Sequence, residues 1–379
     1  AVKGCQVIFI AVGTPSSDEG EADLTQVVQV TEAMASSLDT YSLIVIKSTV
    51  PVGTVDLLRS ILCRNKQEGK DFDIVANPEF LSEGNGLTDF FYPDRIVIGT
   101  SSEKAKEIMR SLYDPIVKRQ VSWLQNEPIS SMTSAVPVIY TDLNSAQMIK
   151  YASNAFLATR ISFINEIAEM CERLGANCKE VARGMGYDSR IGHKYLNAGL
   201  GFGGPCLEKD LKALINIAKS NGVEPHLLQA ALERNDKQIA LVITKLKQVL
   251  GDSLDNKNVA IFGLAFKAGT NDVRNSLSLR VINQLLTEGV LLQAHDPVAI
   301  PSFKHLKEYD SGVVLHNDPY EAVKHVDALL ILTDWPIFSE LDYSRIKSFM
   351  TTPVIIDARN MLKPETLGSL GYTYYGIGQ

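Results

Sequence analysis

A cysteine lies in a glycine-rich loop ahead of a predicted helix, in the run Gly203-Gly204-Pro205-Cys206-Leu207-Glu208-Lys209-Asp210. A thiol becomes a nucleophile when positive charge or a helix N-terminus favours the thiolate. Cys206 stands at such a junction, with Lys209 nearby and Asp210 one turn further on. The alternative is a buried and inert cysteine, the commonest fate of this residue type. The loop alone leaves both interpretations open.

Lys150 and Asn154 lie four residues apart in a long helical pattern. Residues i and i+4 share one face of a helix, so the ammonium and the amide point the same way. Such a pair of donors could stabilise a developing oxyanion. The alternative is a lysine whose aliphatic stem covers an apolar surface beside a satisfied amide.

Polar loops follow three predicted strands in the first part of the chain. Glu79 and Glu83 come just after one of them, where ligands approach an open α/β sheet. The two carboxylates could do acid–base work or could cap a helix. Residues 11–15 and 48–54 follow two other strands, and each of these loops could also be an ordinary turn.

Residues 199–204 formally satisfy the dinucleotide pattern G-x-G-x-x-G. That fingerprint requires a strand before it and a helix opening at its last glycine, and residues 194–198 are not a strand pattern. We therefore expect these glycines to shape the loop before Cys206 or to let backbone approach a ligand. No other stretch supplies the fingerprint, so we expect that the N-terminal strand–turn–helix carrying it is absent from this chain. Dinucleotide binding would then be weak, since the pyrophosphate site is missing.

Short apolar runs alternate with helical patterns in both outer thirds of the chain. In the first third, helices are expected to start near Asp23 and Gly53, and the predicted strands are residues 7–12, 42–46, 72–75 and 95–98. In the last third, a helix is expected over residues 276–286, and the predicted strands are residues 259–262, 291–294, 328–332 and 354–356. Strands this apolar, separated by helices, favour parallel sheets covered on both faces.

One helical pattern is much longer than the others. It runs from Ala146 to Leu174 without glycine or proline, and Gly175 follows as a C-cap. Its length suggests a spine that links domains or subunits. More helix follows to about Leu250, and residues 251–257 resemble a linker. We predict an α/β fold of two doubly wound Rossmann-like domains joined by a central helical domain, with boundaries at residues 1–135, 136–250 and 251–379.

The composition excludes several classes of protein. The 379 residues carry a net charge of −7, with 45% hydrophobic and 21% charged residues, as in soluble globular proteins. No basic cluster could follow a phosphate backbone, and no apolar run approaches the ~20 residues of a membrane span. The five scattered cysteines are typical of reduced thiols in a cytoplasm, and their spacing does not indicate zinc. We predict a cytoplasmic protein that binds no nucleic acid, membrane or metal.

Together, these stretches resemble the UDP-glucose/GDP-mannose dehydrogenase family over essentially the whole chain. The matching stretches, in family order, are 12–15 (VGTP), 48–54 (STVPVGT), 77–81 (NPEFL), 93–99 (PDRIVIG), 150–151 (KY), 154–158 (NAFLA), 165–166 (NE), Asp188 with 190–192 (RIG), 203–204 (GG) with Cys206 and 209–210 (KD), 263–267 (GLAFK), 272–276 (DVRNS), 296–297 (DP), and Asp357 with 359–360 (RN). A dozen ordered matches are far more specific than any one motif.

The resemblance implies an N-terminal NAD-binding domain, a central dimerisation domain and a C-terminal domain that binds the UDP-sugar. Enzymes of this family oxidise the C6 alcohol of a nucleotide sugar to a carboxylate with two NAD⁺, through an intermediate attached to a cysteine. We expect NAD as the cofactor, UDP-glucose as the substrate, and a homo-dimer or higher homo-oligomer.

The same resemblance assigns catalytic roles. Cys206 would form the thiohemiacetal and then the thioester, and Lys150 with Asn154 would stabilise the oxyanion. Asp210 would orient water and help move protons, and Glu79 would assist thioester hydrolysis. The remaining catalytic residue is Thr49, which would hold the water network.

Binding residues are also implied by the resemblance. The expected NAD contacts are Thr14, Thr49, Glu83 and Arg274. The expected UDP-sugar contacts are Glu79, Phe80, Leu81, Lys150, Asn154, Arg190, Tyr195, Phe202, Gly203, Lys267 and Arg359, with Arg190 reaching the pocket of a neighbouring subunit.

The cysteine loop departs from the usual family pattern Gly-Gly-Ser-Cys-Phe-Pro-Lys-Asp. Pro205 removes a backbone N–H beside the thiol, and Glu208 adds a negative charge that could raise the thiol pKa. Leu207 also differs, and Leu277 replaces a usual proline. Leu157 favours the UDP-glucose branch, since GDP-mannose enzymes tend to have histidine there.

Other functions are kept open. UDP-N-acetylhexosamine or GDP-mannose could be the substrate, or the protein could bind a sugar nucleotide without catalysis. A thiol enzyme without nicotinamide would need a histidine base near Cys206, and His193 is the nearest in sequence.

Overall fold

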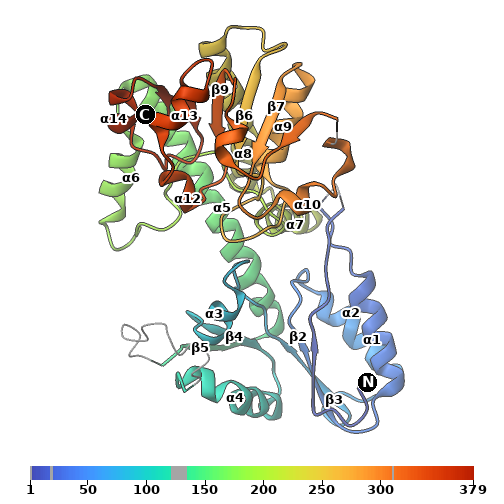
Figure 1. The fold of residues 1–379 in the computed structure, drawn as a ribbon. Helices are drawn as coiled ribbons and strands as arrows, with labels where there is room; N and C mark the ends of the chain where they lie inside the picture. Colours follow the sequence, from blue (N-terminus) through green and yellow to red (C-terminus); the bar gives the residue numbers. More distant parts are fainter. Residues whose placement is uncertain (1, 18–19, 121–134, 310) are drawn as a thin grey trace. The chain divides into compact units, whose positions relative to one another are not determined.

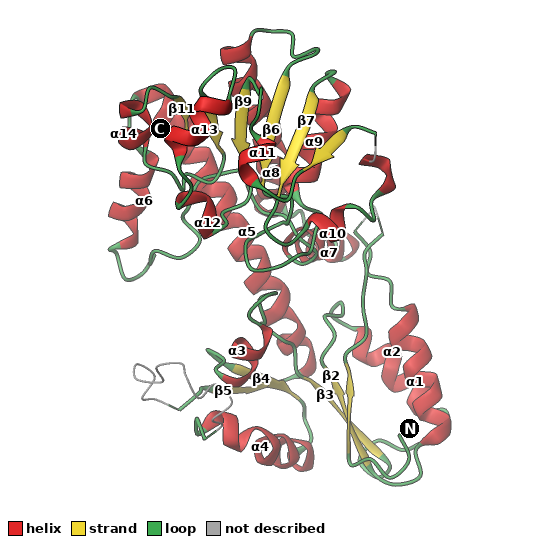
Figure 2. Ribbon diagram, viewed as in Figure 1, coloured by secondary structure: helices red, strands yellow, loops and turns green. Residues whose placement is uncertain are grey.

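The computed structural model describes residues 2–17, 20–120, 135–309 and 311–379 (Figures 1 and 2). The chain forms two compact units, each made of two segments. The first unit contains residues 1–154 and 209–224, and the second contains residues 155–208 and 225–379. The three predicted domain boundaries stay a prediction.

The described strands form two sheets. In the first unit they are β1 (Val7–Ile10), β2 (Ser42–Ile46), β3 (Phe72–Ala76), β4 (Ile96–Gly99) and β5 (Val138–Thr141). In the second unit they are β6 (Asn258–Phe262), β7 (Leu291–His295), β8 (Val313–Leu315), β9 (Ala328–Ile331), β10 (Val354–Asp357) and β11 (Thr373–Tyr375).

The helices of the first half are α1 (Thr25–Ser37), α2 (Thr54–Leu62), α3 (Gly86–Phe91), α4 (Glu103–Val117), α5 (Leu143–Leu174), α6 (Cys178–Gly186) and α7 (Leu207–Ser220). Those of the second half are α8 (His226–Leu250), α9 (Leu277–Thr287), α10 (Ile300–Phe303), α11 (Pro319–Ala322), α12 (Pro336–Ser339), α13 (Tyr343–Phe349) and α14 (Pro364–Ser369), with a 3₁₀ turn, η2, at Lys307–Tyr309.

The first sheet has the order β1-β2-β3-β4-β5, and β1, β2 and β3 are parallel. Strand β2 shows why these residues form a doubly covered strand. Alternate side chains point to opposite faces. Ile44 and Ile46 pack with α1 and α2, whereas Leu43 and Val45 pack with α4. Its five residues are all buried, as a continuous apolar run predicts.

The second sheet has the order β11-β10-β9-β6-β7-β8 and is parallel throughout. One face carries Val259 and Ile261 and packs against α8 and α9. The other carries Ala260 and Phe262 and packs with the α11–α14 region. Two parallel, doubly covered sheets and the long α5 confirm the predicted fold class.

The 32-residue α5 is the predicted spine helix, starting three residues earlier than expected. It ends at Leu174 because Gly175 takes a left-handed conformation, φ +70°. Lys150 and Asn154 both lie on it, four residues apart. Among the described residues, no helix is both long and apolar enough to cross a membrane.

Three local predictions are corrected by the structure. Strand β4 runs antiparallel to β3, whereas the alternation had favoured a parallel pair. The only helix between them, α3, has six residues and buries none, so it does not make a crossover that covers the sheet. Strand β1 ends at Ile10 rather than Val12. At the start of α1 the capping position is Leu24, and Asp23 instead accepts the N–H of Thr25 at 2.8 Å.

Candidate active site

Lys150 and Glu79 form a partly buried ion pair in the first unit. The Lys150 ammonium is almost fully buried and lies 3.1 Å from Glu79 Oε1. Glu79 follows β3, and its Oε2 accepts the backbone N–H of Leu81 at 2.5 Å. An ammonium has three N–H donors, so the pair leaves Lys150 able to serve a further acceptor. The pair can therefore move a proton or stabilise an oxyanion.

Phe80 packs beside this pair. Its ring centroid lies 3.8 Å from the Arg95 guanidinium and 5.5 Å from Lys150 Nζ. Arg95 also donates to Ser153 Oγ at 3.3 Å, which connects it to α5. The aromatic face therefore lies between two cations, an arrangement that stabilises both through the ring quadrupole.

Asn154 and Asp210 form a second buried pair in the same unit. Asn154 Nδ2 donates to Asp210 Oδ2 at 2.6 Å. The other carboxylate oxygen of Asp210 accepts from Lys209 Nζ at 2.6 Å. The structure thus brings together Asn154, one turn after Lys150 on α5, and Asp210, in the first turn of α7. A buried carboxylate with a neighbouring cation stays ionised and can orient water.

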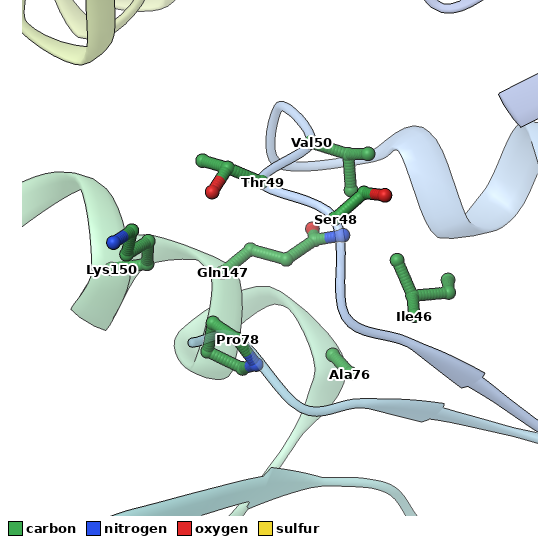
Figure 3. A pocket seen from close by; sticks show the side chains of 8 residues that line it. All are labelled: Ile46, Ser48, Thr49, Val50, Ala76, Pro78, Gln147 and Lys150. Carbon is green, nitrogen blue, oxygen red and sulfur yellow. The ribbon is translucent and has the colours of Figure 1, made fainter. Parts of the chain in front are cut away.

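Loops after β1 and β2 meet at Thr14 and Thr49. Thr14 Oγ1 donates to the Thr49 carbonyl at 2.8 Å. Thr49 also lines a small pocket of about 230 Å³ beside the carboxyl ends of β2 and β3 (Figure 3). The residues lining it are Ile46, Ser48, Thr49, Val50, Ala76, Pro78, Gln147 and Lys150. Thr49 and Lys150, predicted from separate motifs, therefore share one cavity.

Lys47 is a charged residue of this region that the sequence reasoning missed. It ends β2, and its Nζ donates to Asn77 Oδ1 at 3.2 Å and to the Pro78 carbonyl at 3.5 Å. Burial lowers the pKa of the Lys47 ammonium from 10.5 to about 8; the charge on Glu79 opposes this shift and the charge on Lys150 adds to it. Lys47 therefore belongs electrostatically to the Lys150–Glu79 pair. Its position directly before the Ser48-Thr49 loop was the signal that could have found it.

Asn77 holds Lys47 in place. Its Oδ1 also accepts from the Tyr113 hydroxyl at 2.6 Å, and its Nδ2 donates to the Val97 carbonyl at 2.7 Å. Asn77 is fully buried, so its amide orientation is set by these partners.

The low pKa of Lys47 predicts a pH-dependent change in stability. Between about pH 8 and 10.5 the unfolded chain binds more protons at Lys47 than the folded chain, so wild-type stability rises across this window. Lys47→Met removes the titration. We expect the free energy of unfolding of the wild type to gain up to about 3 kcal/mol relative to Lys47→Met between pH 7 and 10.5. Chemical denaturation at several pH values measures this.

A matched control is Lys118→Met, which removes an exposed lysine that pairs with Asp114 on α4. Its stability should follow that of the wild type across the same pH range. Parallel profiles for Lys47→Met and wild type would contradict the assignment of a depressed pKa to Lys47.

Cys206 lies in the second unit, exposed and directly before α7. The glycine loop before it is closely packed, which explains the misleading dinucleotide pattern. A Cβ on Gly203 would lie 2.7 Å from the Asn275 carbonyl oxygen, and one on Gly204, which has φ +82°, would enter the Phe266 ring. The glycines therefore shape the loop through close backbone approach, one of the two predicted roles.

Glu208 does not leave an uncompensated charge beside the thiol, as the sequence had suggested. Arg280 on α9 forms an ion pair with Glu208 and also lies 3.1 Å from Asp236. Because Arg280 is 72 residues further along the chain, no local pattern could predict this pairing. The expected effect of Glu208 on the thiol is therefore offset by a neighbouring cation.

Other predicted residues of the second unit surround this loop or lie apart from it. Arg359 Nε donates to the Leu332 carbonyl at 2.7 Å, and its Nη1 donates to the Gly201 carbonyl at 3.3 Å. Phe202 is buried, and its backbone N–H donates to Asn235 Oδ1 at 2.8 Å. Lys267 follows β6, with its Nζ 5.7 Å from the Phe266 ring centroid.

Several predicted residues are exposed. Arg190 pairs with Asp188 at 2.7 Å on the surface, and Arg274 pairs with Asp272 at 2.6 Å. Tyr195 has a left-handed backbone with φ +62°. Leu81 and Glu83 lie in an exposed bend after β3. The predicted ligand contacts of these residues stay predictions.

His193, the histidine of the rival thiol enzyme, packs edge-on against Tyr187 with ring centroids 5.2 Å apart. In the described part of the chain, no three His, Cys, Asp or Glu side chains are grouped so that they could hold a metal ion.

Sequence models of three domains of one family match the chain. Residues 1–117 match the NAD binding domain of the UDP-glucose/GDP-mannose dehydrogenase family, residues 144–237 match its central domain, and residues 260–364 match its UDP binding domain. The chain is also 44% identical over 379 residues to the UDP-glucose 6-dehydrogenase TuaD of Bacillus subtilis, covering all of this chain and 78% of that protein. The chain belongs to the UDP-glucose/GDP-mannose dehydrogenase family.

Further relatives agree. A UDP-glucose 6-dehydrogenase of Rickettsia bellii is 40% identical over 380 residues, which cover all of this chain and 82% of that protein. The solved structure of a UDP-glucose dehydrogenase from Pyrobaculum islandicum has a TM-score of 0.84 at 34% identity and covers 98% of this chain and 80% of that one. This member of the family is an NAD-dependent dehydrogenase.

The residues at the edge of the first sheet fit NAD. The carboxyl ends of parallel strands are where nucleotide cofactors bind in open α/β sheets. Here the loops after β1 and β2 are joined by the Thr14–Thr49 hydrogen bond, and they present hydroxyl and backbone groups beside a polar pocket. This set of donors and acceptors, with no buried carboxylate in the pocket lining, suits a neutral amide and ribose ring.

Proposed function

We propose that the protein oxidises UDP-glucose at C6 to UDP-glucuronate, using two NAD⁺ for each sugar. The observation that carries this proposal is the pair of buried polar clusters, Lys150–Glu79 and Asn154–Asp210, based on one face of α5. Such buried donors with carboxylate partners suit stabilising and protonating an oxygen that becomes charged. The relatives named UDP-glucose 6-dehydrogenase, at 44% and 40% identity, support this substrate.

In the first half of the reaction, Cys206 acts as the nucleophile. Its thiolate adds to the aldehyde carbon formed in the first oxidation and gives a thiohemiacetal. Lys150 and Asn154 donate hydrogen bonds to the developing oxyanion, each from a side chain held by a carboxylate partner. The second oxidation converts the thiohemiacetal to a thioester.

In the second half, water hydrolyses the thioester. Asp210 orients water and accepts protons together with Lys150, and Glu79 receives the proton that Lys150 passes on, since their polar atoms are 3.1 Å apart. Thr49 contributes to the water network from the pocket it shares with Lys150. The products are UDP-glucuronate and the free thiol.

NAD, when bound, accepts the two electrons of each oxidation. The residues that would hold it are Thr14, Thr49, Glu83 and Arg274. The UDP-sugar would be held by Phe80, Leu81, Tyr195, Phe202, Gly203, Lys267 and Arg359, and by Arg190 of a neighbouring subunit. Lys267 and Arg359 carry the positive charge that a diphosphate requires.

A different sugar nucleotide is the second candidate. A solved UDP-D-ManNAc dehydrogenase from Pyrococcus horikoshii has a TM-score of 0.82 at 27% identity, so this fold also accommodates N-acetylhexosamines. GDP-mannose and binding without catalysis complete the alternatives.

NADH formation from four sugar nucleotides tests the function. The purified protein should give two NADH per sugar with UDP-glucose and much less with UDP-N-acetylglucosamine, UDP-N-acetylgalactosamine or GDP-mannose. A preference for an acetylated sugar would change the substrate while keeping the reaction. Binding of UDP-glucose with no NADH from any of the four would favour the non-catalytic role.

The protein is further proposed to work as a homo-dimer or higher homo-oligomer in the cytoplasm. Phe156, Phe163, Met170 and Leu174 are 62%, 48%, 47% and 81% exposed and follow one another on α5 at intervals of seven, seven and four residues. This spacing places them in one apolar stripe, typical of a helix that pairs with a second helix. A second copy offers the same stripe in return. All five cysteines lie in the described residues and none forms a disulfide, as expected in a reducing compartment.

Phe163→Glu should break this association. A carboxylate in an apolar helix pair must be desolvated, so we expect a shift to monomer at micromolar concentration, measured by light scattering after size-exclusion chromatography. Leu291→Glu is the matched control, because Leu291 is 53% exposed at the start of β7, outside the stripe. An unchanged mass for Phe163→Glu would contradict the assignment of this face.

A further inference from the structure

Gln147 is a buried amide with no hydrogen-bond partner. It lies on α5, three residues before Lys150, and only 5% of the residue is exposed. Neither Oε1 nor Nε2 reaches a partner, although both atoms are fully buried. Leaving a buried amide unpaired costs on the order of 1–3 kcal/mol, so such groups are nearly always satisfied by a water or a ligand.

The amide is directed into the pocket beside the carboxyl end of β2. In Figure 3 the Gln147 side chain extends from α5 toward the loop of Ser48 and Thr49, and Lys150 lines the same pocket from the next turn of α5. The Ser48 hydroxyl donates to the Val12 carbonyl at 2.6 Å, so its proton is already used. No side chain of the described chain therefore meets the donor and acceptor needs of Gln147.

One water molecule fits these needs. The free space in the pocket is about that of one water, and a buried water requires two to four polar partners. The Gln147 amide, the hydroxyls of Ser48 and Thr49, and the ammonium of Lys150 all line the space and supply them. A glutamine amide can both donate and accept, so it can fix the orientation of this water as well as its position.

We propose that Gln147 is a positioning residue for the hydrolytic half of the reaction: it holds one water in this pocket, beside the Lys150–Glu79 pair. This inference rests on the proposed function. In the step, the water oxygen bonds to the acyl carbon, the carbon–sulfur bond breaks, and Cys206 leaves with the electron pair as a thiolate. Lys150 passes a proton to Glu79 and takes one from the water, and the carboxylic acid product then ionises to the uronate.

Gln147→Met tests this role, since methionine has a similar volume and cannot hold the water. Rapid-mixing kinetics with UDP-glucose should show an initial burst of two NADH per active site at a rate within about threefold of wild type. Steady-state turnover should fall about 10- to 100-fold, because a misplaced water slows only hydrolysis. Mass spectrometry should then find the acyl group on the peptide that contains Cys206.

The control is Gln29→Met, an exposed glutamine on α1, which should behave as wild type in both phases. Wild-type turnover for Gln147→Met would overturn the inference. An equal loss of burst and turnover, without an acyl adduct, would also overturn it, because a merely structural role predicts that result. Wild type gives its two NADH in either case, so the proposed function is judged separately.

A crystal structure of the wild-type protein provides a readout that does not depend on the variant folding. It should show one water within hydrogen-bond distance of the Gln147 amide and of Lys150 or Thr49. A dry pocket, or an amide turned to a protein partner, would overturn the inference.

Discussion

Cys206→Ser should lower NADH formation from UDP-glucose by about 10⁴-fold or more. Losing the nucleophile of a covalent mechanism typically costs a factor of this size or larger. A serine hydroxyl is almost never ionised near neutral pH, whereas a thiol has a pKa of about 8.5 and forms some thiolate. Without a covalent hemiacetal the second oxidation has no bound alkoxide to act on. Absorbance of NADH under saturating substrate measures the loss.

The control for this prediction is Cys63→Ser, which alters another exposed thiol, at the end of α2. It should leave NADH formation unchanged, and calorimetry should show that Cys206→Ser still binds UDP-glucose. Turnover of Cys206→Ser within tenfold of wild type would rule out a thioester intermediate.

The periodic elements of the fold could be predicted from the sequence. Each strand that was predicted is a continuous apolar run, as in β2, because burial on both faces leaves no polar position. The strands that were missed, β5, β8 and β11, are edge strands with partly exposed residues and no such run. The direction of β4 also could not be predicted, since a side-chain pattern is the same for parallel and antiparallel neighbours.

The candidate site was predictable only where its chemistry lies in local motifs. Cys206 and Lys150 stand in such motifs, and the structure adds their partners. Lys47 and Gln147 were missed, because what distinguishes them is burial against an element about 100 residues away in the sequence. An ordinary lysine at a strand end and an ordinary glutamine in a helix have no local pattern that separates them from surface residues.

Arg280 shows why a departure from a family motif cannot be interpreted alone. Glu208 replaces a usual proline and brings a carboxylate close to Cys206 in sequence. Arg280 comes from α9 to pair with it, and the same guanidinium also contacts Asp236 on α8. The charge at this position is therefore compensated, and Pro205, which lacks a backbone N–H, remains the change with a direct chemical consequence for the loop.

Lys150→Met should lower kcat by about 10²- to 10³-fold with little change in the KM for UDP-glucose. Its ammonium is assigned to a charge that develops during the reaction, so its loss affects the transition state more than the bound substrate. Glu79→Gln should reduce kcat as well, because an amide cannot take the proton that Lys150 passes on. Steady-state NADH kinetics of the two variants measure both effects, and Lys106→Met, which breaks a surface pair with Glu103, is the control.

The double variant decides whether Lys150 and Glu79 act together. Their polar atoms are 3.1 Å apart and the ammonium is nearly buried, so each side chain depends on the other for its charge. Residues that act as one unit give non-additive losses. The kcat of Lys150→Met/Glu79→Gln should therefore fall little further than that of Lys150→Met. A loss equal to the product of the two single losses would mean that the two residues contribute independently, with Glu79 acting on water without Lys150.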